Sequence, residues 1–154
     1  MKTKFLTLSM IALMAITSIS CSKDEPTAAT PVAQNPVAGA GFSWRENDQN
    51  ATAIQTAASA SFSNQFKTLI ARDAAGNTIF EINLSGSTPA TYLFSATYGN
   101  ALTFTTPNPV FDATSGEFII TANANGKLSG TFKAFRAGTG ITRLYGTVTD
   151  ISVN

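Results

Sequence analysis

The chain has 154 residues, with 10 Lys or Arg, 9 Asp or Glu and a net charge of +1. It contains one Cys and no His, which excludes an internal disulfide, a Cys/His pair, a Ser/His/Asp triad and a His-ligated metal within this chain. The balanced charge also gives no electrostatic footprint for nucleic acid.

Residues 1–20 have the layout of a lipoprotein signal peptide. Lys2 and Lys4 give a basic start, and residues 5–19 are apolar apart from Thr and Ser. This arrangement is typical of an export signal. The apolar run is shorter than the ~20 residues that a membrane-spanning helix needs, so we expect the segment to be removed on export.

The single cysteine, Cys21, ends the sequence "SISC". This stretch resembles the lipobox of bacterial lipoproteins, in which a diacylglycerol is attached to the thiol and the signal is cut immediately before the cysteine. Ser18 stands where that motif prefers Leu, Ile or Val. The resemblance implies a lipid anchor at Cys21, and the alternative is ordinary signal cleavage beside an incidental thiol.

An acidic segment follows the cysteine directly. It resembles the export signal of some Gram-negative surface lipoproteins, which sends them to the outer face of the outer membrane. The alternative is a solvated charge cluster at the head of a linker, on a protein that faces the periplasm. The segment consists of Ser22, Lys23, Asp24 and Glu25.

The remainder of residues 21–40 predicts a tether. Pro26, Pro31 and Pro36 recur at intervals of five, and the stretch from Pro26 to Ala40 carries no charge. Proline favours extended backbone, and there is too little large apolar surface to offset the entropy of ordering. We therefore expect a flexible or partly polyproline linker between the lipid and a folded domain.

Residues 41–154 predict one all-β domain. Seven basic and seven acidic residues balance its charge, so no basic patch favours nucleic acid or membrane adsorption. Turn signals recur about every 8 to 15 residues. Such short, regular spacing indicates an antiparallel sandwich or barrel-like domain of about eight to ten strands.

The clearest hairpin lies in residues 117–135. Phe118, Ile120 and Ala122 alternate with other residues on the outgoing strand, and Asn125-Gly126 is a strong signal for a type I′ turn. On the returning strand we expect Leu128, Gly130, Phe132 and Ala134 to face inward, and Ser129, Thr131, Lys133 and Phe135 to face outward.

A second hairpin pairs residues 68–72 with residues 78–84 across the turn Asp73–Asn77. Just before it, Phe62, Phe66, Leu69 and Ile70 also fit a helical spacing, although strand structure is favoured. In the second hairpin we expect Phe80, Ile82 and Leu84 to face inward, and Ile79, Glu81 and Asn83 to face outward.

The last strand changes parity. Leu144, Gly146 and Val148 share one face, whereas Ile151 and Val153 have the opposite parity. If all five are buried, a β-bulge falls near Thr149 or Asp150. We expect the Asp150 carboxylate to cap backbone N–H groups at the bulge, ahead of any catalytic role.

Four stretches together carry a wider resemblance. They look like parts of a family of small bacterial lipoproteins of unknown function, with a lipidated cysteine, a Pro-rich tether and one all-β domain ending in G-T-x-T-D-I. The resemblance implies fold and anchoring, and it supplies no catalytic or binding residues. The stretches are "GFSWRENDQNATAI" (41–54), "FEINLSG" (80–86), "ANGKLSGTF" (124–132) and "GTVTDISV" (146–153).

No catalytic constellation emerges, and the sequence predicts a protein that is not an enzyme and needs no cofactor. Glu81 and Glu117 are the one acidic pair that neighbouring strands could bring together, and surface solvation is the favoured role for both. A bunch of oxygens after Trp44 resembles a weak Ca²⁺ loop, but a polar turn is favoured. That bunch is Glu46, Asn47, Asp48 and Asn50.

Exposed aromatics are the best candidates for binding. Trp44 is expected to anchor the core. Phe135, on the polar face of its strand with Lys133 beside it, is the best candidate for contact with a glycan or protein partner. The aromatics considered are Trp44, Tyr92, Tyr98, Phe111, Phe135 and Tyr145.

Two functional hypotheses follow. The first is a membrane-anchored surface binding, adhesion or structural module of unknown biochemical activity. The second is a small β-barrel that encloses an apolar ligand, in which small inward residues leave interior room. Those residues are Ala122, Gly130, Ala134 and Gly146.

Overall fold

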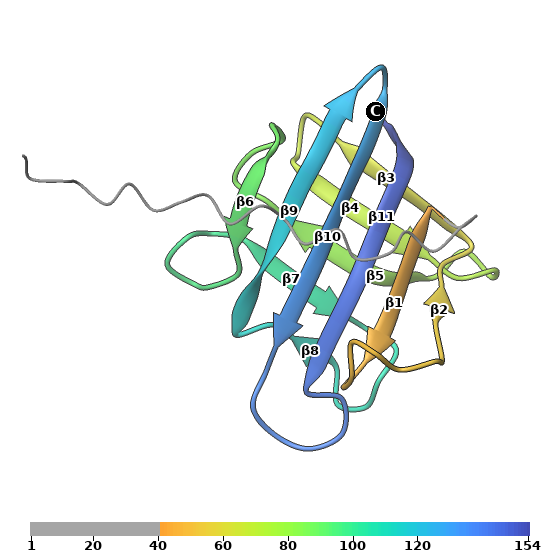
Figure 1. Ribbon diagram of the computed structural model, residues 1–154, viewed down its shortest axis with the longest axis vertical. Coiled ribbons are helices and arrows are strands. Elements are labelled where there is room, and N and C mark those ends of the chain that lie inside the picture. The colour runs from red at the N-terminus through yellow and green to blue at the C-terminus, as the bar shows by residue number, and fades with distance from the viewer. Residues whose placement is uncertain (1–40) are drawn as a thin grey trace, which may run out of the picture. The chain divides into compact units, whose positions relative to one another are not determined.

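The computed structural model describes residues 41–154, which form an all-β domain (Figure 1). The predicted signal peptide, the tether, Cys21 and the export residues Ser22, Lys23, Asp24 and Glu25 lie outside the described residues. Within the described part, no helix is long and apolar enough to cross a membrane. The prediction of an all-β domain is confirmed.

The domain has 11 strands in one sheet, slightly more than predicted because two of them are only two residues long. In chain order they are β1 (Phe42–Glu46), β2 (Gln55–Thr56), β3 (Ser59–Ser63), β4 (Thr68–Arg72), β5 (Thr78–Asn83), β6 (Ala90–Leu93), β7 (Ala101–Phe104), β8 (Phe111–Asp112), β9 (Ser115–Ala124), β10 (Lys127–Phe135) and β11 (Arg143–Val153).

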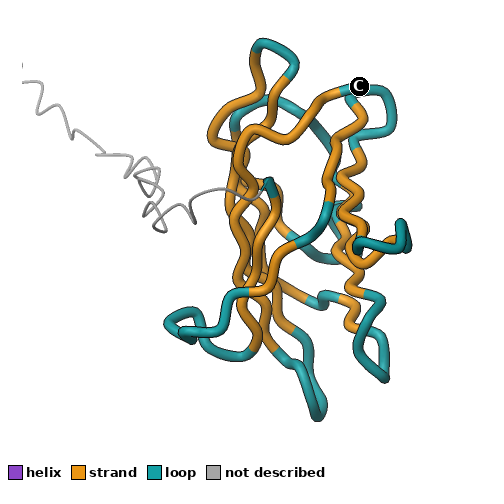
Figure 2. Tube along the Cα trace, turned by 90° about the vertical axis from the view of Figure 1, so that its right-hand side faces the viewer, coloured by secondary structure: helices purple, strands orange, loops and turns teal. Residues whose placement is uncertain are grey.

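The sheet curls around β11, which joins two layers. The first part of β11 pairs with β1 in antiparallel fashion, and its last residues pair with β3 in parallel. One side of the domain, the front layer, holds β6, β9, β10, the first part of β11, β1 and β2; the back layer holds β3, β4, β5, β7 and β8. Figure 1 shows the front strands crossing those behind, and Figure 2 shows the two layers from the side.

The predicted bulge in β11 is confirmed. The register between β10 and β11 shifts at Ser129, which faces both Thr149 and Asp150, and Asp150 has a φ of 48°. The Asp150 N–H donates to the Ser129 hydroxyl, and that hydroxyl donates to the Asp150 carboxylate, both at 2.9 Å. The expected cap is therefore wrong in detail, because the Ser129 hydroxyl, and not the carboxylate, accepts the backbone N–H.

The β9–β10 hairpin is confirmed, with positive φ at both Asn125 and Gly126 as a type I′ turn requires. The four residues of β10 expected to face inward are all buried. Ala122, however, is exposed. The register between β9 and β10 shifts beside Gly130 and leaves Thr121 as an extra residue, so the alternation of β9 breaks before Ala122.

The β4–β5 hairpin is also confirmed, and residues 59–72 form strands joined by a turn at Phe66. Ile79 was expected to face outward but is buried. The register between β4 and β5 shifts at this point, because Ala71 pairs with Phe80 while Arg72 pairs with Thr78. Ile79 is thus the extra residue of a bulge, which turns its side chain toward the core.

Aromatic rings from both layers fill the space between them. The Phe80 and Phe104 rings of the back layer stack with centroids 4.4 Å apart, and Trp44 of the front layer meets Phe80 edge-on at 5.0 Å. Phe42 approaches Phe80 to 4.9 Å. Trp44 is 7% exposed, so its predicted role as a core anchor is confirmed.

The inward glycines do not leave room for a ligand. A Cβ atom on Gly146 would lie 2.1 Å from the Phe132 ring, and one on Gly130 would lie 2.9 Å from the Phe118 ring. The Phe132 ring therefore occupies the space over Gly146, and the Ile119 carbonyl oxygen, at 2.4 Å, and the Phe118 ring together close the space over Gly130. The interior room that the sequence suggested at these positions, and at the exposed Ala122, is not present there.

Candidate binding site

The outer face of the front layer carries a row of residues that lie directly opposite one another on successive strands. The row runs from Leu93 on β6 through Glu117 on β9, Lys133 on β10 and Tyr145 on β11 to Arg45 on β1. Cross-strand partners point to the same side of a sheet. We call these residues the outer row, and they face away from the aromatic core.

Lys133 stands at the middle of the outer row, in an ion pair. Its Nζ lies 2.8 Å from the Glu117 Oε1, and the two side chains are 49% and 22% exposed. An exposed pair of this kind contributes about 0–1 kcal/mol to stability, so its main effect is to fix two charges on the face. Lys133, which the sequence places beside Phe135 as a candidate ligand contact, is therefore already paired with Glu117.

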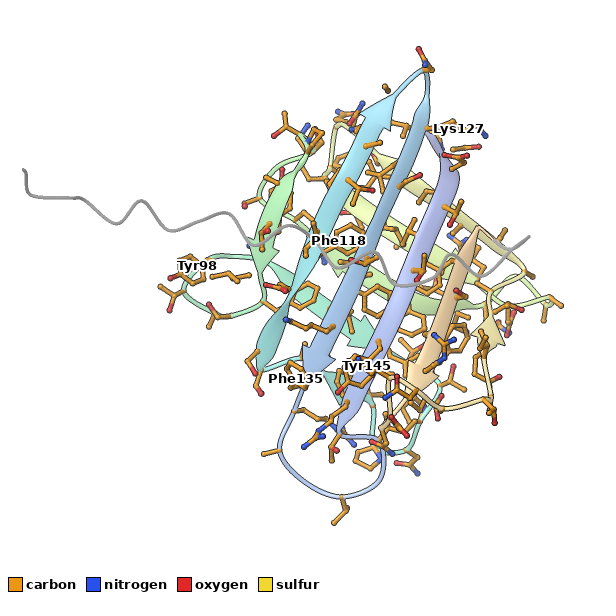
Figure 3. The ribbon with its side chains drawn as sticks, in the orientation of Figure 1. Tyr98, Phe118, Lys127, Phe135 and Tyr145 are labelled. Carbon is orange, nitrogen blue, oxygen red and sulfur yellow. The ribbon has the colours of Figure 1, made fainter. Side chains whose placement is uncertain are left out.

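Phe135 lies on the same outer face, two residues beyond Lys133 on β10. Its ring meets the Tyr145 ring edge-on at 6.1 Å and an angle of 79°, and Figure 3 shows the two side chains together on β10 and β11. Both are half-buried. Phe135 is thus on the predicted face, although it is less exposed than the sequence suggested.

A groove of about 300 Å³ opens beside β6, at the edge of the front layer. Tyr98, on the loop between β6 and β7 (Figure 3), and Leu93 line it with exposures of 58% and 43%. Sequence reasoning named Tyr98 as an aromatic but missed the groove, because the lining comes from several segments. The lining residues are Ser85, Thr91, Tyr92, Leu93, Tyr98 and Asn100.

Asn100 fixes the base of this groove. It is 5% exposed. Its Oδ1 accepts the Ser85 N–H at 2.6 Å, and its Nδ2 donates to the Leu93 carbonyl at 2.9 Å. One buried amide side chain therefore ties the segment before β6 to the end of β6. A lone Asn gives no sequence signal for such a role.

The acidic pair considered from the sequence is not formed. Glu81 lies on β5, between strands β4 and β7 of the back layer. Glu117 lies on β9 of the front layer and pairs with Lys133. The two carboxylates belong to different layers, so neighbouring strands do not bring them together.

The oxygens after Trp44 form a polar turn, as favoured. Glu46 accepts the Trp44 indole N–H at 3.1 Å, and Asp48 accepts the Asn50 N–H at 2.9 Å. Asn47, with a φ of 62°, accepts the Thr142 N–H at 2.8 Å. Across residues 41–154, no three His, Cys, Asp or Glu side chains gather as metal ligands.

Comparison of the chain with protein-family models, with curated proteins and with solved structures found no match. The resemblance to small lipoproteins therefore stays a prediction from the quoted residues.

Proposed function

We propose that this protein is a lipid-anchored bacterial outer-membrane protein, displayed at the cell surface, whose β domain docks a protein partner. The observation that carries the proposal is the outer face of the front layer, where Phe135 and Tyr145 sit beside the Lys133–Glu117 pair. The signal peptide, Cys21 and the acidic segment Ser22–Glu25 support the anchor and the address.

The composition of this face suits a protein interface. Tyr, Phe and Arg are enriched in such interfaces, and a fixed charge pair contributes specificity. Tyr145, Phe135, Arg45 and Arg143 all belong to the outer face of β10, β11 and β1. None of them belongs to the buried core, so these aromatics are available to a partner without separating the two layers.

The size of the face also suits a partner. Five strands at ~4.8 Å spacing make it roughly 20 Å wide, and nine residues of β10 at ~3.3 Å each make it roughly 30 Å long. The area is at most roughly 600 Å², because the marginal strands β6 and β1 have only 4 and 5 residues, and this suits a weak or transient interface, below the ~800 Å² that each protein contributes to a standard one.

The anchor is tested by the variant Cys21→Ala in cells. Because Cys21 is the one thiol in the chain, its replacement removes the group to which the proposed diacylglycerol is attached. The variant is expected in the soluble fraction, whereas a Ser22→Ala control stays with the membrane. Full retention of Cys21→Ala in the membrane would show that the anchor is not this cysteine.

The address is tested separately. Replacing Lys23, Asp24 and Glu25 together with Ala is expected to keep membrane attachment but to protect the protein from protease added to whole cells. Unchanged digestion of the variant would contradict a role of these residues in surface display.

The docking face is tested by replacing Phe135 with a photoreactive phenylalanine analogue, with the same analogue at Glu81 on the outer face of the back layer as the control. A discrete cross-linked adduct is expected from position 135 only. Excess purified full chain should compete for it, and the double variant Phe135→Ala/Tyr145→Ala should not. Equal adducts from both positions, or none from 135, would overturn the assignment of the face.

A further inference from the structure

The groove beside β6 gathers exposed apolar side chains that folding does not require. Five large hydrophobic side chains of residues 41–154 are exposed, and two of them, Tyr98 and Leu93, line this groove. The others, Ile54, Phe66 and Val110, lie on separate loops and turns. Both of these apolar side chains border one hollow, so a single ligand in it can cover the two together.

The groove is held in shape by hydrogen bonds beneath it. In addition to the two bonds of Asn100, the Tyr92 hydroxyl donates to the Thr88 carbonyl at 2.8 Å. The Tyr98 N–H donates to the Ser95 carbonyl at 3.2 Å, and the Phe94 N–H donates to the Gly116 carbonyl at 2.9 Å. The Tyr98 ring therefore stands on a loop fixed at both ends, which lowers the entropic cost of binding.

The rim offers hydroxyl groups and no charge. The side-chain hydroxyls of Ser85, Thr91 and Tyr98 make no hydrogen bond to any part of residues 41–154. The lining contains no Asp, Glu, Lys or Arg. The nearest acid by register is Glu117, the partner of Leu93 across β6 and β9, and it is already paired with Lys133.

We propose that this groove binds a neutral hexopyranose ring. The apolar C–H face of such a sugar stacks on the Tyr98 ring beside Leu93, as aromatic faces favour. Its hydroxyls exchange hydrogen bonds with Ser85 and Thr91. The volume of about 300 Å³ lies at the lower end of the roughly 300–1,000 Å³ of small-molecule sites, which suits a single ring.

The absence of charge in the lining decides between neutral and acidic sugars. A uronic acid in the groove would bring a carboxylate with no cation among the lining residues to pair it. A neutral ring meets only hydroxyl and apolar groups. The groove adjoins the outer row at Leu93 but contains neither Phe135 nor Tyr145, the two aromatics of the docking proposal, which lie on β10 and β11.

The experiment titrates the purified full chain with neutral disaccharides of glucose, galactose, mannose and N-acetylglucosamine, and with a glucuronate disaccharide. Binding is followed by saturation-transfer NMR and calorimetry. At least one neutral disaccharide is expected to bind, and the glucuronate compound to bind about tenfold more weakly or not at all. Tyr98→Ala is expected to weaken binding about tenfold, and Tyr98→Phe much less because it keeps the ring.

Thr91→Val provides a second variant that keeps the side-chain shape and removes one hydroxyl, and it is expected to weaken binding about threefold. Phe66→Ala removes an even more exposed aromatic from a different turn and should leave binding unchanged. Failure of every neutral sugar to bind, preference for the glucuronate, or equal affinity of Tyr98→Ala and wild type would overturn the proposal. Phe135→Ala should not alter sugar affinity, so a failure of the sugar-binding proposal can be told apart from a failure of the docking proposal.

Discussion

The two faces of the front layer both carry a phenylalanine of β10, which is buried in the core on the inner face and half-buried on the outer face. Phe132 and Phe135 lie three residues apart on β10. Phe132 is 2% exposed, packs against Phe42 at 5.5 Å and fills the space over Gly146. Phe135 is half-buried on the other side and meets one aromatic neighbour, Tyr145.

This difference shows how the layer separates stability from recognition. On the inner face, Gly146 on β11 has no side chain, and the Phe132 ring of the neighbouring strand β10 fills the space above it. The packing of each of these two residues therefore depends on the other. On the outer face, side chains are held by neighbours of the same face and remain in contact with water. A change on the inner face should therefore alter folding, and a change on the outer face should mainly alter binding.

The largest expected effect is that of Phe132→Ala. Removing the ring leaves a cavity bordered by Gly146, which has no side chain to fill it, and by Phe42 and Phe118. The free energy of unfolding should fall by about 3–5 kcal/mol, measured by urea denaturation of the full Cys21→Ala chain. A loss under about 1 kcal/mol would show that packing on the inner face does not make the main contribution to the stability of the fold.

The next largest effect is that of Gly146→Ala, in which the added Cβ would lie 2.1 Å from the Phe132 ring. Overpacking of this kind costs about 1–3 kcal/mol. Because Phe132 is the obstacle, Phe132→Leu should be less damaging in the Gly146→Ala background than in the wild type. Strictly additive losses in the double variant would contradict the proposed dependence of ring on glycine.

Much of this fold was predictable because its signals are local. Asn125-Gly126 specifies a turn with two positive φ angles, and the change of parity in β11 requires a bulge. Ala122 and Ile79 were misplaced because bulges of β9 and β5 leave no mark in the residues themselves. The parallel pairing of β11 with β3 joins residues far apart in the sequence, and alternation alone cannot predict it.

The candidate sites were less predictable for the same reason. Phe135 and Lys133 could be placed on an outer face from their alternation with Phe132 and Ala134. The pairing of Lys133 with Glu117 depends on the register of two strands. The groove depends on Asn100, whose amide joins two segments of the chain and which has no distinguishing neighbour in the sequence.

A smaller effect is expected for Phe135→Ala, the outer-face counterpart of Phe132→Ala. The half-buried ring gives up its edge contact with Tyr145, which is worth about 0.5–1.5 kcal/mol, and a loss of about 1 kcal/mol is expected. A double-mutant cycle with Tyr145→Ala measures the coupling directly. A loss as large as that of Phe132→Ala would place Phe135 in the core and remove the distinction between the faces.

The smallest effect is expected at Asp73, a half-buried residue in the turn between β4 and β5. Its carboxylate accepts the Asn77 side-chain N–H at 3.0 Å and the Asn77 backbone N–H at 2.8 Å. These bonds, the side-chain one first, hold the pKa of Asp73 below its usual 3.8. The folded state thus favours the ionised form.

Because the pKa of Asp73 is lower in the folded state, the charge stabilises the fold at pH values above the ordinary carboxyl pKa. That contribution is lost as the pH falls through the folded pKa. Asp73→Asn should therefore melt slightly below the wild type near neutral pH, and the gap in melting temperature should narrow as the solution is made strongly acidic. A gap that stays constant over this range would mean that Asp73 acts through turn geometry alone, without its charge.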